Sequence, residues 1–131
     1  MYLGGRTLFS AERAEMNREE GTEVVVVWTT FPGNDDPALF SQTLVSERLA
    51  ACVTIQRGIT SVYRWRNGIE KAVEYQLTIK TTVDRLGDLE RRLGELHPYD
   101  VPEFLILPIK GGSAMYLEYV ASSTQPEQGS D

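Results

Sequence analysis

The sequence has very little of what usually carries metal or redox chemistry, with one histidine, His97, and one cysteine, Cys52, in 131 residues. A single cysteine excludes an internal disulfide and fits a reducing compartment. No apolar run approaches the roughly 20 residues of a membrane span, and residues 1–21 lack the apolar core of a signal peptide. We therefore expect a soluble, cytoplasmic protein that does not bind membranes.

Basic residues are also few, because 13 Lys and Arg stand against 19 Asp and Glu, which gives a net charge of −6. Nucleic-acid binding requires a clustered basic surface, so this balance argues against a nucleic-acid partner. Hydrophobic residues make up 41% of the chain and charged residues 24%, as in ordinary globular domains. A chain of this length buries about two thirds of its unfolded surface, so it needs neither a disulfide nor a metal to fold.

The signatures of common catalytic sites are missing as well. No glycine-rich phosphate loop follows a predicted strand, and the chain has neither a nucleophile elbow nor an HExxH motif. A cysteine–histidine hydrolase would need Cys52 and His97 within hydrogen-bond reach and a third orienting group, for which we find no signature. We expect a protein that is not an enzyme. Cys52 begins an apolar strand, so we predict a buried and unreactive thiol.

One apolar, regularly patterned segment lies between two polar ends. Residues 1–21 and 122–131 are polar and have few apolar anchors, so we expect both segments to be tails. The domain then spans residues 22–121, which is an ordinary size for a single domain.

The first half of this domain predicts a strand, a helix and a second strand. Residues 23–31, EVVVVWTTF, are almost all β-branched or aromatic, which indicates a strand buried on both faces. Asp36 can cap a helix that has Pro37 at its first position and runs over residues 38–50. Residues 51–56 return as a strand. The predicted buried stripe of the helix consists of Ala38, Val45 and Leu49.

Next comes a hairpin, in which the runs GITSVYRW and GIEKAVEYQLTIK meet at Asn67–Gly68. Asn-Gly between β-rich runs is the strongest short-range hairpin signal, because both turn positions need positive φ. A two-residue turn at these positions pairs Arg66 with Ile69. The register of the whole hairpin follows from that pair.

The two faces of this hairpin differ in character. The predicted register places Val62 opposite Val73, on a face that continues through Leu77 into the core. Tyr63 and Trp65 lie on the other face. A two-stranded ribbon is marginal in water, so we expect a neighbouring subunit to cover these aromatics and predict Tyr63 and Trp65 at the subunit interface.

The second half completes an α+β order. Thr82 can cap a helix over residues 83–96, and residues 103–110 predict an apolar strand with Pro108 at an edge or near its end. A short helix, AMYLEYVASS, follows. The order β-α-β-β-α-β with an additional C-terminal helix is the split βαβ arrangement, an antiparallel sheet with two helices on one face. Helical spacing over residues 83–96 is held by Leu86, Leu89, Leu93 and Leu96.

His97 begins the stiff sequence HPYDVPE, for which two interpretations stay open. In the structural one, the residue before Pro98 must leave the α conformation, so His97 ends the helix, where the macrodipole favours it when protonated. In the functional one, the rigid joint presents His97 as a nitrogen ligand and Asp100 and Glu103 as oxygen ligands of a metal ion.

The chain from about residue 23 to residue 120 resembles the CutA family of divalent-cation tolerance proteins. The matching stretches are LVSERLAACVTI, GITSVYRWRNGIE, LTIKTT, LHPYDVPEFLILPI and YLEYV, in this order and spacing. The resemblance implies a ferredoxin-like α+β sandwich and a homotrimer built around packed sheets. It also implies a role in divalent-cation handling, with copper most often invoked.

The resemblance further implies a ligand set and leaves two other functions open. The family's proposed metal ligands, the histidine of the His-Pro-Tyr motif and the glutamate after the second proline, correspond to His97 and Glu103. Some members place a cysteine at the end of the first strand, where this chain has Trp28. A site without thiolate favours a harder or borderline cation, Cu(II) or Zn(II), over Cu(I). The alternatives are a trimeric sensor of a small anionic ligand, like the PII signalling proteins, and a non-enzymatic adaptor trimer.

Overall fold

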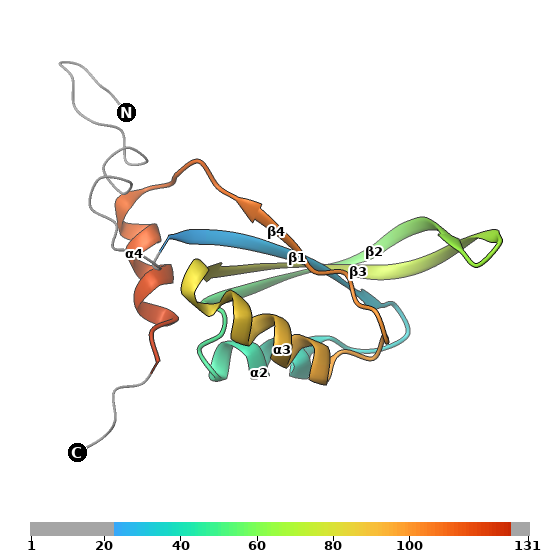
Figure 1. Ribbon diagram of the computed structural model, residues 1–131, viewed down its shortest axis with the longest axis horizontal. Coiled ribbons are helices and arrows are strands. Elements are labelled where there is room, and N and C mark those ends of the chain that lie inside the picture. The colour runs from blue at the N-terminus through green and yellow to red at the C-terminus, as the bar shows by residue number, and fades with distance from the viewer. Residues whose placement is uncertain (1–22, 127–131) are drawn as a thin grey trace.

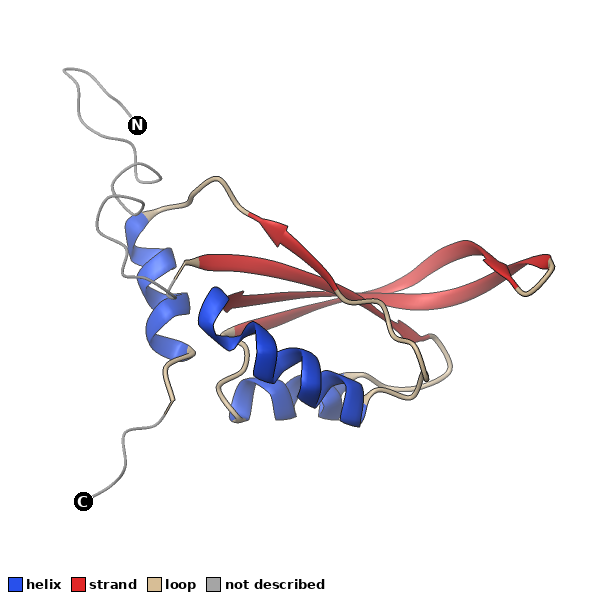
Figure 2. Cartoon of the chain, viewed as in Figure 1, coloured by secondary structure: helices blue, strands red, loops and turns tan. Residues whose placement is uncertain are grey.

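The computed structural model describes residues 23–126, which form a four-stranded antiparallel sheet with helices against it (Figure 1; Figure 2). The sheet order is β2-β3-β1-β4, which confirms the predicted split βαβ arrangement with a C-terminal helix. Within the described range, no helix is long and apolar enough to cross a membrane. In chain order the elements are β1 (Val24–Pro32), α2 (Ala38–Ser46), β2 (Cys52–Trp65), β3 (Gly68–Thr82), a 3-10 turn (Val83–Arg85), α3 (Leu86–Leu96), β4 (Leu105–Pro108) and α4 (Ala114–Ser123).

The core lies between the sheet and helices α2 and α3. The predicted leucine stripe of α3 is confirmed, because Leu89 and Leu93 are buried and Leu86 and Leu96 pack against them. The buried residues of the core come from both the sheet and the helical layer and are Val27, Phe31, Phe40, Leu44, Leu49, Ala50, Leu77, Ile79, Leu89 and Leu93.

Burial of β1 on both faces was expected but is wrong for the single chain. Val27 and Phe31 face the helices and are buried, whereas Trp28 on the opposite face is 40% exposed. Helices α2 and α3 both lie on one face of the sheet (Figure 2). The β-branched run therefore predicts the strand correctly but not what covers its second face.

Helix α2 ends at Ser46, four residues before the predicted end, because Arg48 adopts a left-handed φ of 60°. The Arg48 N–H donates to the Val45 carbonyl and the Leu49 N–H to that of Leu44, both at 3.0 Å. This is the hydrogen-bond pattern of a Schellman helix end, where glycine is the usual residue. An arginine there gives no sequence signal for the end of the helix.

The Arg48 side chain reaches the C-terminal end of helix α4. Its guanidinium Nη1 donates to the Ser123 carbonyl at 3.3 Å and to the Ser122 carbonyl at 3.4 Å, in the last turn of α4. These carbonyls lack intrahelical partners at a helix C-terminus, so a cation there is favourable. Arg48 thus ends one helix with its backbone and caps another with its side chain.

The early end of α2 also changes its buried face. Asp36 Oδ1 accepts the Ala38 N–H at 2.9 Å, as expected of a capping side chain, although the helix begins at Ala38 and Pro37 takes the N-cap position rather than the first helical one. The predicted stripe is wrong, however, because Ala38 and Val45 are exposed and Leu49 is buried only beyond the helix. The buried residues of α2 are Phe40, Ser41 and Leu44.

The hairpin register differs from the predicted one by two residues. Trp65 pairs with Gly68, so Arg66 and Asn67 form the loop, and Arg66 takes the positive φ of 56°. Val62 consequently lies opposite Lys71 rather than Val73. A shift of two residues leaves every side chain on its original face, so the alternation of the sequence could not distinguish the two registers.

Beyond the end of β1, strands β2 and β3 continue as a two-stranded arm that projects from the domain (Figure 1). Val62 and Val73 on this arm are 63% and 62% exposed. The predicted continuation of their face into the core therefore holds from Tyr75, which packs against the core, through Leu77 onward. A bulge between Gln56 and Ile59 separates the arm from the rest of β2.

The C-terminal helix is tied to the sheet by a buried pair of threonines. Thr82 was expected to cap α3, but its Oγ1 instead contacts Asp84 Oδ1 and, at 3.2 Å, the Oγ1 of the fully buried Thr124. Helix α4 runs to Ser123, past the expected domain boundary at residue 121. The expected N-terminal tail, residues 1–21, lies outside the described residues.

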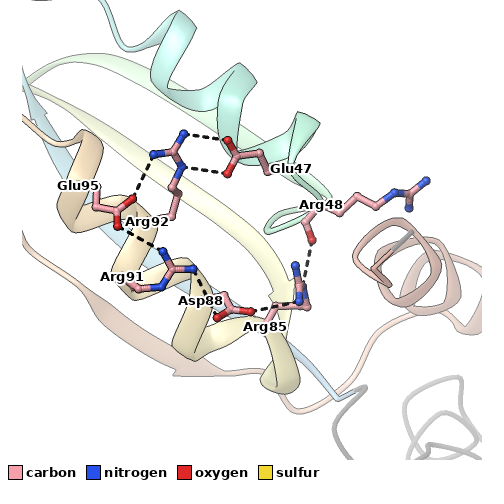
Figure 3. A network of polar contacts seen from close by, with 7 residues as sticks. All are labelled: Glu47, Arg48, Arg85, Asp88, Arg91, Arg92 and Glu95. Carbon is pink, nitrogen blue, oxygen red and sulfur yellow. Dashed lines mark hydrogen bonds and ion pairs between the residues drawn. The ribbon is translucent and has the colours of Figure 1, made fainter. Parts of the chain in front are cut away.

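Helices α2 and α3 are also joined by exposed charges (Figure 3). Glu47 accepts two hydrogen bonds of 2.9 Å from the Arg92 guanidinium, which hold the pKa of its carboxyl below the ordinary value. Arg92 and Arg91 both contact Glu95, and Arg91 also contacts Asp88. Because these groups are exposed, salt screens them, and they orient the helices more than they stabilise them.

Gly94→Ala should stabilise the fold. Gly94 lies in α3, and a Cβ there would meet nothing within 4 Å, so alanine would gain helix propensity without a clash. We expect a gain of roughly 0.5–1 kcal/mol in the free energy of unfolding, measured by urea titration. Gly33→Ala is the opposite control, because its Cβ would overlap the Val73 carbonyl oxygen. A stability loss in Gly94→Ala would contradict the open environment of this position.

Candidate functional site

His97 lies at the C-terminal end of α3 and is buried. Its φ of −77° and ψ of 140° are extended, as expected for a residue that precedes a proline. The ring is 7% exposed and contacts the rings of Phe31 and Phe40, with centroids 5.2 and 5.6 Å away. The sequence therefore correctly placed His97 at the helix end.

Both ring nitrogens of His97 are occupied by backbone groups. Nδ1 lies 3.0 Å from the Tyr99 N–H, which can only donate, so Nδ1 accepts and carries no proton. Nε2 then carries the proton and donates to the Thr30 carbonyl at 2.6 Å. Burial lowers the pKa of His97, against opposing effects of the Thr30 hydrogen bond and the Glu74 charge. The neutral ring thus has no free lone pair for a metal ion.

The other two predicted ligands, Asp100 and Glu103, both line a cavity of about 920 Å³ that His97 does not line. Its lining residues come from the arm, from residues 98–103 and from the neighbouring positions Thr30 and Glu74. Within residues 23–126, no group of three or more His, Cys, Asp or Glu side chains is placed to hold a metal ion. Two of the three predicted ligands therefore line one cavity, and His97 lies apart from it. The cavity residues with polar or aromatic side chains include Tyr63, Trp65, Glu74, Tyr99, Asp100 and Glu103.

Glu74 is a site residue that we did not predict. It belongs to β3, is 7% exposed, and accepts a hydrogen bond of 2.6 Å from the Tyr99 hydroxyl. Burial and this hydrogen bond raise the pKa of Tyr99. The sequence did offer one signal, because strand alternation puts Glu74 on the same face as Tyr63 and Trp65.

The cavity is electrostatically negative. Burial raises the pKa of the Glu103 carboxyl, the charge of Glu74 raises it further, and a hydrogen bond from Gln76 partly offsets the rise. Neither Lys nor Arg is among the described residues that line the cavity. Such a site favours a positively charged ligand over an anion.

Cys52 is half-buried, whereas full burial was predicted. Its Sγ lies 3.8 Å from the Lys80 ammonium and 3.9 Å from the Thr54 hydroxyl. The difference arises because β2 is the outer strand of the sheet, so one side of its first residues is open. Cys52 does not line the acidic cavity.

These features define a class: a ferredoxin-like α+β domain with a projecting two-stranded arm, at whose base an acidic cavity lies against a histidine–proline joint. Residues 25–123 match the family described as CutA1 divalent ion tolerance protein. The chain belongs to that family, which confirms the resemblance found in the sequence.

Relatives and solved structures agree with this membership. The chain is 39% identical over 125 residues to Protein CutA 1, chloroplastic, of Oryza sativa, covering 95% of this chain and 71% of that protein. It is 41% identical over 99 residues to the divalent-cation tolerance protein CutA of Thermus thermophilus, covering 76% of this chain and 96% of that one. The crystal structure of CutA1 from Oryza sativa superposes with a TM-score of 0.77 at 39% identity, covering 82% of this chain and 98% of that chain. CutA from Xylella fastidiosa gives 0.75 at 38%, covering 79% and 99%.

Stability should fall between about pH 7 and pH 5 because His97 is held neutral. An unfolded histidine has a pKa near 6.5, and the folded value is lower, so the unfolded chain binds the proton more readily in this window. His97 is the only histidine, so His97→Gln should flatten this part of the pH profile. Urea titrations at several pH values would measure it. Equal losses in both proteins would show that the ring is not held neutral.

Proposed function

We propose that the protein handles divalent cations by binding them, without catalysing a reaction. The observation that carries this proposal is the acidic cavity, which presents Glu74, Asp100 and Glu103 in a chain of the divalent ion tolerance family. Carboxylate oxygens are ligands for divalent cations, and Zn(II) and Cu(II) accept them together with nitrogen donors or water. The cytoplasmic location expected from the sequence stays a prediction.

We place the cation at Asp100 and Glu103 and give His97 a positioning role. The imidazole would ligate only after it gave up its hydrogen bond from the Tyr99 backbone. Two carboxylates do not complete a coordination shell, so water or a second subunit would supply the remaining ligands. An anionic ligand, as in a PII-like sensor, fits this cavity poorly because the described lining residues include no cation.

We also propose that the protein works as a trimer assembled through the arm. Exposed apolar side chains occur on both of its faces, with Trp65 57% and Tyr63 43% exposed on one and Val62, Ile69 and Val73 each more than 60% exposed on the other. Two different exposed apolar faces suit head-to-tail contacts between subunits, which close into rings such as trimers. An adaptor function would leave one such face for another protein.

Metal affinity should depend on the carboxylates and not on the histidine. Asp100→Asn and Glu103→Gln should each weaken Zn(II) or Cu(II) binding by roughly tenfold, the usual effect of losing one charged ligand contact. His97→Gln should leave the affinity nearly unchanged, because an amide can keep both backbone hydrogen bonds. Calorimetry at pH 7.5 measures all three. Loss of binding in His97→Gln alone would show that the histidine is the ligand.

Sedimentation equilibrium should give a trimer mass at micromolar concentration. Trp65→Asp should shift the population toward smaller species, because a charge in an apolar interface is costly to bury. Leu39→Asp is the matched control, since Leu39 is 74% exposed on α2, outside the arm. A monomer mass for the wild-type protein would disprove the trimer, and equal effects of both substitutions would disprove the arm as its interface.

A further inference from the structure

Tyr99 makes two hydrogen bonds that hold the segment after α3, residues 98–101, to the rest of the domain. Its N–H donates to His97 Nδ1 at 3.0 Å, and its hydroxyl donates to Glu74 at 2.6 Å. The other residues of this segment are exposed, Val101 to 86%. A segment with so little buried surface opens locally at a lower free-energy cost than the whole fold. The Tyr99 hydrogen bonds therefore decide whether the segment stays in place.

The hydrogen bond between Tyr99 and His97 exists only while the imidazole is neutral. A backbone N–H can only donate, so it needs an unprotonated Nδ1 as its acceptor. Nε2 already holds its proton against the Thr30 carbonyl at 2.6 Å. A second proton must therefore bind Nδ1, where it faces the Tyr99 N–H. Two donors cannot share a hydrogen bond, so the imidazolium forms when the Tyr99 backbone moves away.

The other neighbours of His97 keep the ring in place. Phe31 of β1 and Phe40 of α2 pack against it and carry no charge. In the described part of the chain, the charge that acts on the imidazole is that of Glu74 on β3, which favours the protonated form. The Tyr99 hydroxyl stays neutral, because burial and the hydrogen bond to Glu74 raise its pKa. The ring is thus fixed by strand and helix, and the segment after it is the part that can move.

We propose that His97 is a pH-sensitive switch, whose neutral ring holds residues 98–101 in place and whose protonation at Nδ1 releases them. The movement ends at Phe104, which packs against the core. An exposed histidine has a pKa near 6.5, and burial lowers the pKa of His97 in the closed state. The open form therefore gains population as the pH falls below about 6.5, and the gain levels off below the closed-state pKa.

Amide hydrogen exchange of the full-length protein, followed by NMR without added metal, tests the switch. The protection factor of the Tyr99 amide, corrected for the intrinsic pH dependence of exchange, should fall by roughly three- to tenfold between pH 7.5 and pH 5.5. His97→Gln should abolish this fall, because an amide can keep both backbone hydrogen bonds but does not titrate. A constant protection factor in the wild-type protein would overturn the proposal.

Low concentrations of urea separate local opening from global unfolding. Local opening exposes little surface, so exchange of the Tyr99 amide should hardly respond to urea. The amide of Ile79, a fully buried residue of β3, should exchange faster as urea is added. If the Tyr99 amide responds as steeply as that of Ile79, the segment does not open by itself and the proposal is wrong.

Glu74→Gln separates the switch from a segment that is merely loose. Loss of the Glu74 charge lowers the pKa of His97, so the midpoint of opening should move to lower pH. Glu90→Gln is the matched control, because Glu90 is exposed on α3, and it should leave the midpoint unchanged. Faster exchange at every pH with an unmoved midpoint in Glu74→Gln would show that His97 does not control the opening.

Opening also carries Asp100 away from Glu103, a consequence that rests on the proposed cation function. Zn(II) affinity, measured by calorimetry from pH 7.5 to pH 5.5, should then fall more steeply in the wild-type protein than in His97→Gln. Absence of Zn(II) binding at every pH overturns the cation function, while the metal-free exchange experiment still decides the switch. Equal pH dependence of Zn(II) affinity in the two proteins overturns the coupling between them.

Discussion

The imidazole of His97 holds together the parts of the molecule that form the cavity. One nitrogen binds the Thr30 carbonyl of β1 and the other binds the Tyr99 backbone, whose side chain continues to Glu74 of β3. A chain of three hydrogen bonds therefore crosses from the inner strand β1 through the end of α3 to the base of the arm. Each link is buried or half-buried, where a lost partner costs more than an exposed one. The loop that carries the cavity's carboxylates depends on this chain for its position.

Much of the fold could be predicted from the sequence because its signals are periodic. The leucines of α3 repeat with helical spacing, and the strand order follows from alternating apolar runs separated by turn residues. The predictions that were wrong concern features for which the sequence has no periodic signal. A hairpin register shifted by two residues keeps each side chain on its face, and Arg48 ends α2 in a conformation that the sequence gives no reason to assign to arginine.

The candidate site was predicted only in part, because proximity in sequence was taken for proximity in space. His97, Asp100 and Glu103 lie within seven residues of the chain, yet the histidine ring packs against Phe31 and Phe40 while the other two residues line the cavity. Glu74, which also lines the cavity, comes from strand β3, more than twenty residues earlier in the chain. Local spacing identifies the residue types, while only the fold decides which of them share a surface.

The left-handed conformation of Arg48 has a consequence for cooperativity. A non-glycine residue in this region costs about 1 kcal/mol or more, which neighbouring structure must offset. Part of that offset comes from the hydrogen bonds that the Arg48 side chain donates to the carbonyls of Ser122 and Ser123, more than seventy residues away in the sequence. If α4 detaches, those hydrogen bonds are lost while the backbone cost remains. Amides at the end of α2 should therefore exchange with solvent together with those of α4, as one unit that opens before the sheet.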